Sequence, residues 1–272
     1  MVGRLVAPVE DGRAARFVGA ADVVADLGNG PVVVLVHGVG IGARAFDRVR
    51  DSLADDHRVL VVRRRGYRSG EPVPSTASVD EQVADLVAVV DARVISSATF
   101  VGVSGGATLV LAVALAHPGL VRAAVVHEPA IGPLAPDLHA ELQAASTRLA
   151  STSGLEGVLG FVNRLVGDSA WARLPAAVAE ELESRWEAVR AEVPEFIAFA
   201  PSVEALAGLA DIALVATVGS RSPACRQLAA KVLESHTGAT VQVLEGVRHL
   251  PHLEAPGRFA AAIRAAAAEA DR

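Results

Sequence analysis

The stretch from Ala98 to Ala116 constrains the fold of this chain more than any other. The apolar run 98–103 predicts a buried strand, and 107–116 predicts a helix. Between them stands G-x-S-x-G, in which Gly102 and Gly106 flank Ser104. A strand that turns directly into a helix bends sharply, and small neighbours let the two elements approach. The pattern predicts an exposed serine hydroxyl at a helix N-terminus, which stabilises an oxyanion. Alone, the motif also fits a glycine-rich turn that merely contains a serine.

Apolar runs and turn signals divide most of the remaining chain into alternating strands and helices. We expect eight strands, at 4–8, 14–19, 32–36, 58–62, 98–103, 123–126, 212–218 and 241–244. The first two form an edge hairpin around Asp11-Gly12, and the unalternating runs are typical of buried parallel strands. Helices are expected at 43–53, 107–116, 223–235 and 256–268, and from the Ser78–Glu81 capping box to about residue 92. This order predicts a mostly parallel sheet covered by helices.

Strand signals stop between residues 131 and 209, where helical patterns cover 137–150, 155–166 and 176–192. We therefore expect residues 1–130 and 210–272 to form the core domain and residues 131–209 to form a helical cap. The cap carries apolar and aromatic side chains, including Trp186 and Phe196, which we expect to contact an apolar substrate.

Composition excludes several other classes of protein. The formal charge of −6 and the absence of long basic runs argue against a nucleic-acid partner. A single cysteine, Cys225, permits neither an intrachain disulfide nor a thiolate zinc site. No leader-like apolar segment or membrane-spanning run is found, so we expect a cytoplasmic protein, monomeric or homodimeric, without membrane contact.

A serine nucleophile requires a base, and two histidines follow the last predicted strand. His249 lies in the loop after that strand, and His252 lies closer to the final helix. We assign His249 as the general base and expect His252 to line the substrate site.

The base requires a carboxylate that orients it, and the usual turn after the penultimate strand, 219–223, contains none. Glu128 follows a neighbouring strand at the same edge of the sheet and can reach the same histidine. Asp211 lies at the wrong end of its strand, and Glu254 follows the histidine too closely. Glu128 could instead cap the turn before Pro129.

An oxyanion hole requires two backbone N–H groups. We expect one from Gly105, directly after the serine, and the other from Val39 or Gly38 in the turn after the first long strand. His37 precedes this turn, and we expect its ring to hydrogen-bond the loop.

Together, Ser104 in its turn, His37-Gly38, the segment Arg65-Gly66-Tyr67-Arg68-Ser69-Gly70 and the late His249 resemble the α/β-hydrolase superfamily. The resemblance covers nearly the whole chain and implies an α/β-hydrolase fold with a mostly parallel eight-stranded sheet and a helical cap. Segments 126–129, 217–224 and 189–201 are similar to the zearalenone lactonases, which open a resorcylic macrolactone. This closer resemblance implies that Glu128 is the triad acid and that Phe196 occupies the position of a substrate-contacting tryptophan.

The sequence thus predicts a serine hydrolase that cleaves a small-molecule carboxylic ester or lactone through an acyl-enzyme, with no metal or organic cofactor. Two alternatives remain open. The same residues fit hydrolysis of a carbon–carbon bond in a β-diketone, or perhydrolysis. The scaffold also fits a non-catalytic ligand-binding protein.

Overall fold

The architecture is that of a twisted sheet with helices on both faces, seen in a computed structural model that describes residues 21–70, 72–75, 77–167 and 174–270. The strands are β1 (Asp22–Leu27), β2 (Val32–Val36), β3 (Arg58–Arg63), β4 (Ala98–Val103), β5 (Val121–His127), β6 (Ala213–Gly219) and β7 (Thr240–Leu244). Their order in the sheet is β1-β3-β2-β4-β5-β6-β7. Only β1 runs antiparallel to its neighbour, and the other pairings are parallel.

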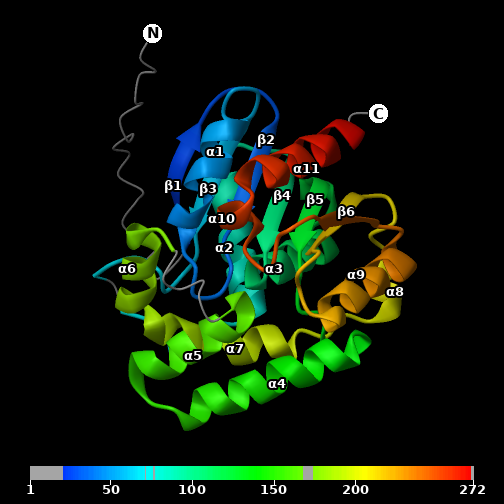
Figure 1. Ribbon diagram of the computed structural model, residues 1–272. Helices are drawn as coiled ribbons and strands as arrows, with labels where there is room; N and C mark the ends of the chain where they lie inside the picture. Colours follow the sequence, from blue (N-terminus) through cyan, green and yellow to red (C-terminus); the bar gives the residue numbers. More distant parts are fainter. Residues whose placement is uncertain (1–20, 71, 76, 168–173, 271–272) are drawn as a thin grey trace.

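Eleven α-helices and three short 3-10 helices connect these strands in the described residues (Figure 1). The helices are α1 (Asp47–Leu53), α2 (Val79–Asp91), α3 (Gly105–Ala116), α4 (Pro136–Ser151), α5 (Gly154–Val166), α6 (Ala176–Ser184), α7 (Trp186–Ala198), α8 (Val203–Ala207), α9 (Ala224–Thr237), α10 (Pro251–Glu254) and α11 (Pro256–Glu269). The 3-10 helices are η2 (Ala43–Phe46), η3 (Pro118–Leu120) and η4 (Gly132–Leu134). None of the helices in this part of the chain is both long and apolar enough to span a bilayer.

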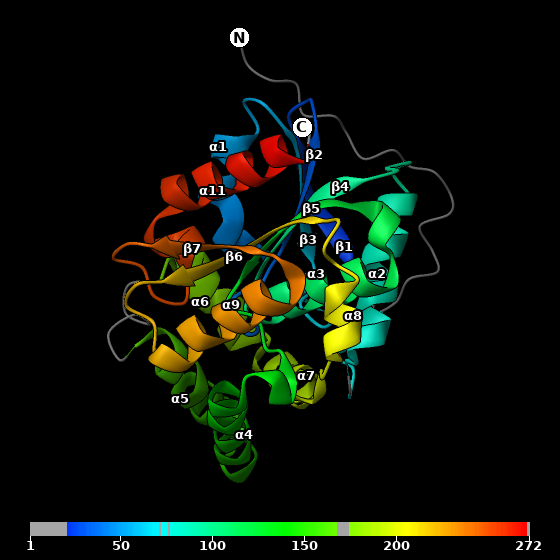
Figure 2. The ribbon, with the colours of Figure 1, turned by 90° about the vertical axis from the view of Figure 1, so that its right-hand side faces the viewer.

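The alternation of side chains along β2 explains the two apolar layers of the core. Val34 and Val36 face the cluster that contains the apolar residues of α2, α3 and α9. Val33 and Leu35 face the other cluster, which contains those of α1 and α11. Both faces of a parallel strand are therefore buried, and this accounts for its continuous apolar run. Figure 2 shows α1 and α11 on one side of the sheet and α2 and α3 on the other.

The sheet has seven strands in the described residues, so the prediction of eight was wrong there. The two edge strands expected at 4–8 and 14–19 lie outside the described residues. The edge is instead formed by β1, which the sequence did not predict. Asp22 and Asp26 of this strand pair with Arg63 and Arg58 of β3, and the two carboxylates interrupt the apolar pattern by which strands are recognised.

Most other predicted elements are present. The capping box at α2 is confirmed, because the Ser78 side chain accepts from the Glu81 N–H and the Glu81 carboxylate accepts from the Ser78 N–H. The single helix predicted over 176–192 is wrong, since α6 ends at Ser184 and α7 begins at Trp186. Arg185 leaves the helical conformation and its Nε donates to the Gly66 carbonyl at 2.7 Å, which fixes the break.

Helices α4 to α7, within residues 136–167 and 174–198, form a layer across one end of the sheet (Figure 1). Side chains of α5, α6 and α7 pack onto Gly40, which follows β2. A Cβ on Gly40 would stand 3.2 to 3.3 Å from Val162, Leu182 and Val189. We refer to this layer as the α4–α7 segment.

Candidate active site

Ser104 occupies a strained turn between β4 and α3. Its backbone has φ 54° and ψ −123°, a conformation that residues with a Cβ rarely adopt. The neighbouring glycines permit the turn. A Cβ on Gly102 would lie 2.3 Å from the Gly106 carbonyl oxygen, and one on Gly106 would lie 2.2 Å from that of Val36. The G-x-S-x-G pattern therefore has a steric cause, which is the close approach of α3 to β4 and β2.

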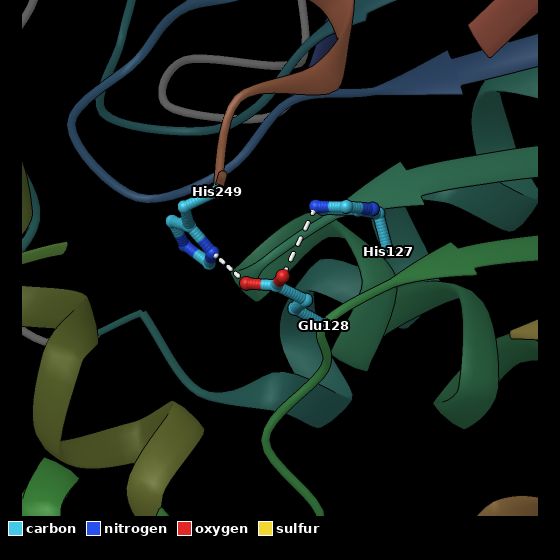
Figure 3. Close-up of side chains that lie close together, drawn as sticks. All are labelled: His127, Glu128 and His249. Carbon is cyan, nitrogen blue, oxygen red and sulfur yellow. Dashed lines mark hydrogen bonds and ion pairs between the residues drawn. The ribbon is translucent and has the colours of Figure 1, made fainter. Parts of the chain in front are cut away.

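His249 and Glu128 meet above the carboxyl ends of the strands (Figure 3). His249 lies in the loop after β7, and Glu128 directly follows β5. The imidazole Nδ1 lies 2.6 Å from Glu128 Oε2. A carboxylate only accepts hydrogen bonds, so Nδ1 carries the proton and Nε2 of the neutral ring keeps its lone pair. Nε2 is buried and has no hydrogen-bond partner among the described residues.

Glu128 is held as a buried carboxylate. Its Oε1 accepts from the Gly219 N–H at 3.1 Å, and Arg226 Nε lies 3.4 Å from Oε2. Burial alone would raise its pKa, but His127, the hydrogen bond from His249 and the charge of Arg226 outweigh that effect and lower the pKa overall. The group that contacts His249 is therefore ionised at neutral pH.

The pKa of His249 is lowered because the ring is buried and the Arg226 guanidinium lies nearby, while Glu128 opposes both effects. The ring is thus neutral near pH 7, which is the state that a base requires.

Val39, in the loop after β2, and Gly105, the first residue of α3, line the same cavity as Ser104, and each has a backbone N–H group. Neither donates a hydrogen bond within the described part of the chain. Gly105 begins α3, so its N–H belongs to the positive end of that helix. Gly38 lies close to the serine, since a Cβ there would stand 3.2 Å from Ser104 Cβ. Both donors are available to an oxygen atom bound beside Ser104.

Two small cavities flank Ser104. One, of about 10 Å³, is lined by Gly38, Val39, Ile41, Val103, Ser104, Val162, His249, Leu250 and His252. The other, of about 30 Å³, is lined by Val39, Ser104, Gly105, Glu128, Ala130, Leu142, Phe161, Val193, Phe196, Ile197 and Arg226. Their sizes correspond to one and to about two water molecules. Side chains of the α4–α7 segment therefore leave little free space beside Ser104.

Of the three predicted substrate-binding residues, two line the cavities beside Ser104 and one does not. His252 lines the first cavity, where it stacks on Phe46 with 4.7 Å between ring centroids. Phe196 lines the second cavity and lies over Gly105. Trp186 borders neither cavity. It lies on an outer groove, where the Arg190 guanidinium is 5.6 Å from its ring centroid. Trp186 precedes Phe196 by ten residues, which is about 15 Å along α7, and this separation places it away from Ser104.

The comparison with known protein families fits this arrangement. Residues 33–262 match the model of the Alpha/beta hydrolase family. The chain belongs to this family.

Individual relatives of this alpha/beta hydrolase are distant. A protein of Mycobacterium phage D29 named "Putative non-heme haloperoxidase" is 28% identical over 110 residues, and the match spans 40% of each chain. The fold is similar to that of a thermophilic esterase from Thermogutta terrifontis, with 20% identity, a TM-score of 0.75, and coverage of 92% of this chain and 93% of the esterase. It is also similar to an enol-lactonase from Burkholderia xenovorans LB400, with 18% identity, a TM-score of 0.75, and coverage of 91% and 96%. At these identities the two structures show a shared fold alone.

His127, Glu128 and His249 place one nitrogen or oxygen atom each within 4.8 Å of one another, which is close enough to raise the question of a metal site. The hydrogen bonds of His127 in this alpha/beta hydrolase show whether its ring can bind a metal. Nε2 of His127 donates to the Arg248 carbonyl at 3.2 Å, so its Nδ1 accepts from the Thr217 hydroxyl at 3.0 Å. His127 therefore has no free lone pair, and the nearby Arg226 opposes a second cation. The donor set does not fit a metal.

Sequence reasoning missed Arg226 and His127. Arg226 lies in the first turn of α9 and contacts Glu128 across 98 residues, and no local pattern signals such a contact. His127 is adjacent to Glu128, and the pair His127-Glu128 at a strand end was the signal available.

Proposed function

We propose that this alpha/beta hydrolase is a serine hydrolase that cleaves a carboxylic ester or lactone. Ser104 is the nucleophile, His249 the general base, and Glu128 the acid that orients the base. The 2.6 Å contact between His249 Nδ1 and Glu128 Oε2 carries the proposal, because it leaves a neutral Nε2 in the cavity that Ser104 also lines.

The reaction has two halves. Ser104 Oγ attacks the carbonyl carbon as His249 Nε2 takes its proton, and the N–H groups of Val39 and Gly105 stabilise the oxyanion. The tetrahedral intermediate then collapses to an acyl-enzyme as the protonated His249 donates its proton to the leaving alkoxide. In the second half, His249 takes a proton from water as the water oxygen attacks the acyl carbon. The second tetrahedral intermediate then collapses to the carboxylic acid, and His249 returns the proton to the leaving Ser104 Oγ. A lactone yields a hydroxy acid because its alkoxide stays tethered.

The lining of the second cavity supports an apolar acyl group. Leu142, Phe161, Val193, Phe196 and Ile197 contribute to it, and all five come from the α4–α7 segment. We propose that this segment acts as the cap of the enzyme and that Phe196 contacts the substrate. The resemblance to zearalenone lactonases favours an aromatic macrolactone within this class.

The test begins with a fluorophosphonate probe and mass spectrometry of the labelled protein. We expect a single adduct on Ser104 and no adduct in Ser104→Ala. A panel of 4-nitrophenyl esters, an aromatic macrolactone, an acyl homoserine lactone and a β-diketone then identifies the bond that is cleaved. Failure of Ser104 to react in the folded protein would overturn the proposal.

The acid has its own test. Glu128→Ala should lower kcat by about 10³- to 10⁴-fold, because His249 loses the group that fixes its tautomer. Asp211→Asn is the matched control, since this exposed carboxylate precedes β6 and lies far from the strand end that carries Glu128. We expect wild-type kcat from the control. A nearly unchanged kcat in Glu128→Ala would assign the acid to another residue.

The likeness to the phage protein favours perhydrolysis as a second candidate. In that reaction hydrogen peroxide replaces water in the second half and releases a peracid from the acyl-enzyme. Incubation with acetate and hydrogen peroxide, followed by an assay for peracetic acid, separates the two. Peracid formation faster than ester hydrolysis would favour the second candidate.

A further inference from the structure

A buried arginine lies behind the loop that carries Val39. Arg64 follows β3 and is 2% exposed. Its Nε donates to the His37 carbonyl and its Nη2 to the Gly38 carbonyl, each at 2.9 Å. Its backbone N–H also donates to His37 Nε2 at 3.1 Å. Arg64 thus holds the peptide groups that immediately precede Val39.

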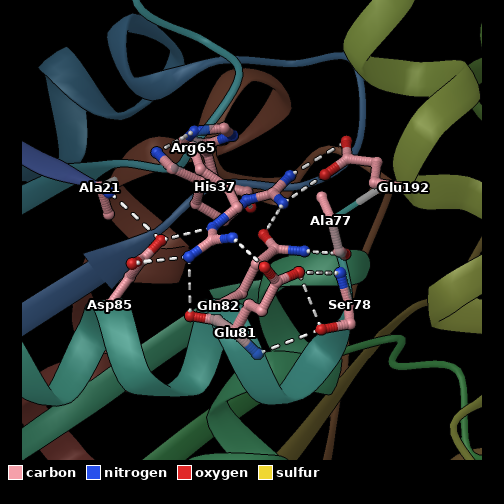
Figure 4. A network of polar contacts seen from close by, with 10 residues as sticks. Ala21, His37, Arg65, Ala77, Ser78, Glu81, Gln82, Asp85 and Glu192 are labelled. Carbon is pink, nitrogen blue, oxygen red and sulfur yellow. Dashed lines mark hydrogen bonds and ion pairs between the residues drawn. The ribbon is translucent and has the colours of Figure 1, made fainter. Parts of the chain in front are cut away.

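The charge of Arg64 is balanced from the α4–α7 segment. Glu192 of α7 is 1% exposed and forms a buried ion pair with Arg64. Gln82 of α2 accepts a further hydrogen bond from Arg64 at 2.7 Å. Figure 4 shows Glu192 approaching this network from the side opposite Asp85, with His37 and Gln82 between them.

Tyr67 links the same glutamate to the other side of Val39. Its hydroxyl donates to Glu192 Oε1 and accepts from the Gly40 N–H at 2.8 Å. Burial, followed by the charge of Glu192, raises the pKa of Tyr67 well above its ordinary value, so the hydroxyl stays protonated and can donate. Glu192 is therefore linked to both peptide groups that flank Val39. Arg64 links it to the Gly38 carbonyl, and Tyr67 links it to the Gly40 N–H.

Helix α7 also contacts the second oxyanion donor. Phe196 lies one turn beyond Glu192, and a Cβ added to Gly105 would stand 3.0 Å from its ring. The Arg64 guanidinium lies 5.4 Å from the centroid of this ring. One helix thus touches the loop of Val39 and the turn of Gly105 at once.

Separating a buried ion pair costs free energy unless water solvates both charges. Glu192 and Arg64 can therefore separate only if both side chains become hydrated. Substrate entry requires the α4–α7 segment to open, and an outward movement of α7 withdraws Glu192 from Arg64 and Tyr67. The loop then loses the contacts that fix its peptide planes.

We infer that Glu192 is a positioning residue for the oxyanion hole, acting through Arg64 and Tyr67, so that the Val39 N–H is aligned only when α7 is seated over the substrate. This inference rests on the proposed function. It adds that closure of the cap completes the site for the chemical step.

Three variants test the inference by ester hydrolysis. Tyr67→Phe removes one hydroxyl and no charge, and Glu192→Gln keeps the shape of the side chain but removes its charge. We expect each to lower kcat by about 10- to 100-fold, which is the size of a weakened oxyanion contact, with less than about a 3-fold change in KM. The double variant should lose no more than the worse single variant, because both residues act on the same loop.

Arg190→Met is the matched control on the same helix. Arg190 anchors α7 to the Leu149 and Thr152 carbonyls and does not contact the loop 37–40. The substitution leaves the contacts of Glu192 with Arg64 and Tyr67 in place, so kcat should stay within about 2-fold of wild type at a temperature where the variant is folded. Unchanged kcat in folded Tyr67→Phe and Glu192→Gln, or losses that multiply in the double variant, would overturn the inference.

An NMR measurement separates this inference from the proposed function. In ¹⁵N-labelled protein, the amide resonances of Val39 and Gly40 should shift in Glu192→Gln and stay in place in Arg190→Met, whether or not any ester is cleaved. A wild-type protein that hydrolyses no member of the panel would overturn the proposed function alone. Unshifted Val39 and Gly40 resonances in Glu192→Gln would overturn the inference alone. Should Glu192→Gln fail to fold, Tyr67→Phe carries both measurements.

Discussion

At the scale of single residues, Arg226 contacts the proposed triad without belonging to it. It is buried, contacts Glu128 at 3.4 Å and lines the cavity next to Ser104. After burial, its charge is the main cause of the lowered pKa of His249. The charge of Arg226 thus lowers the pKa of both groups, which favours the ionised form of Glu128 and the neutral form of His249 that the proposed mechanism requires.

The pH dependence of catalysis should reveal this influence. His249 must be neutral to accept a proton, so kcat/KM falls as the pH drops through its pKa, which lies below the usual 6.5. Arg226→Met removes the positive charge and should move this acidic limb to higher pH. Arg226→Lys retains the charge and should leave the limb near that of wild type. The measurement is kcat/KM of an activated ester between pH 4 and 9, and an unmoved limb in Arg226→Met would contradict the assignment.

At the scale of elements, the junction of β4 with α3 depends on the absence of side chains. A methyl group on Gly106 would meet two carbonyl oxygens of the loop after β2, those of Val36 at 2.2 Å and His37 at 2.6 Å. Backbone atoms cannot swing aside as a flexible side chain can. The junction that presents Ser104 is thus also a place where α3 and the sheet approach too closely for a side chain.

The same substitution, glycine to alanine, at two helical positions tests whether this steric contact limits stability. Gly106→Ala should lower the free energy of unfolding by about 1–3 kcal/mol or more, because the helix must retreat from the sheet. Gly160→Ala lies in the interior of α5 with open space around the added methyl group, and should raise it by up to about 1 kcal/mol. Urea denaturation monitored by circular dichroism measures both. Equal effects at the two positions would contradict the steric explanation.

The elements differ in how well the sequence predicts them. The apolar runs of β2 to β4, the Ser78 cap and the G-x-S-x-G turn depend on neighbours in the sequence, and these were predicted correctly. Strand β1 was missed because its aspartates are matched by Arg63 and Arg58, which only pairing reveals. Likewise, Arg64 and Glu192 are separated by 128 positions, and nothing local to either predicts the ion pair between them.

The site shows the same division. Ser104 and His249 were assigned from their places relative to strands, and the structure places them after β4 and β7 as expected. Glu128 was assigned because the turn 219–223, where the acid usually lies, contains no carboxylate. In the structure its Oε2 lies 2.6 Å from His249 Nδ1. Trp186 was assigned to substrate binding from its aromatic character alone. That character does not predict which face of the helix the side chain lies on or how far it is from Ser104, and Trp186 lies on an outer groove.

At the scale of the whole molecule, buried neutral histidines couple stability to pH. Burial lowers the pKa of His127 to about 4 and that of His252 to about 3, and it lowers the pKa of His37 as well. In the unfolded chain these rings titrate near 6.5, so between the two values the unfolded state binds more protons than the folded state. Stability is therefore complete above about pH 6.5 and declines as the pH falls toward 3.

We expect the urea midpoint to fall steadily from pH 7 to pH 4. His252→Gln should flatten this decline, because it removes a group whose lowered pKa costs on the order of several kcal/mol of stability in acid. His117→Gln is the control, since His117 is exposed at the end of α3. A decline of equal steepness in both variants would show that the acid sensitivity originates elsewhere.

The small volume around Ser104 has a kinetic consequence. The cavities of about 10 and 30 Å³ are smaller than an ester, so the proposed function requires side chains of the α4–α7 segment to move before substrate binds, and only the open form then captures it. The apparent dissociation constant is then the intrinsic one divided by the open fraction. Under the inference above, we expect a mutation that favours the open form to lower the apparent dissociation constant and to lower kcat together, because α7 would be seated over the substrate less often.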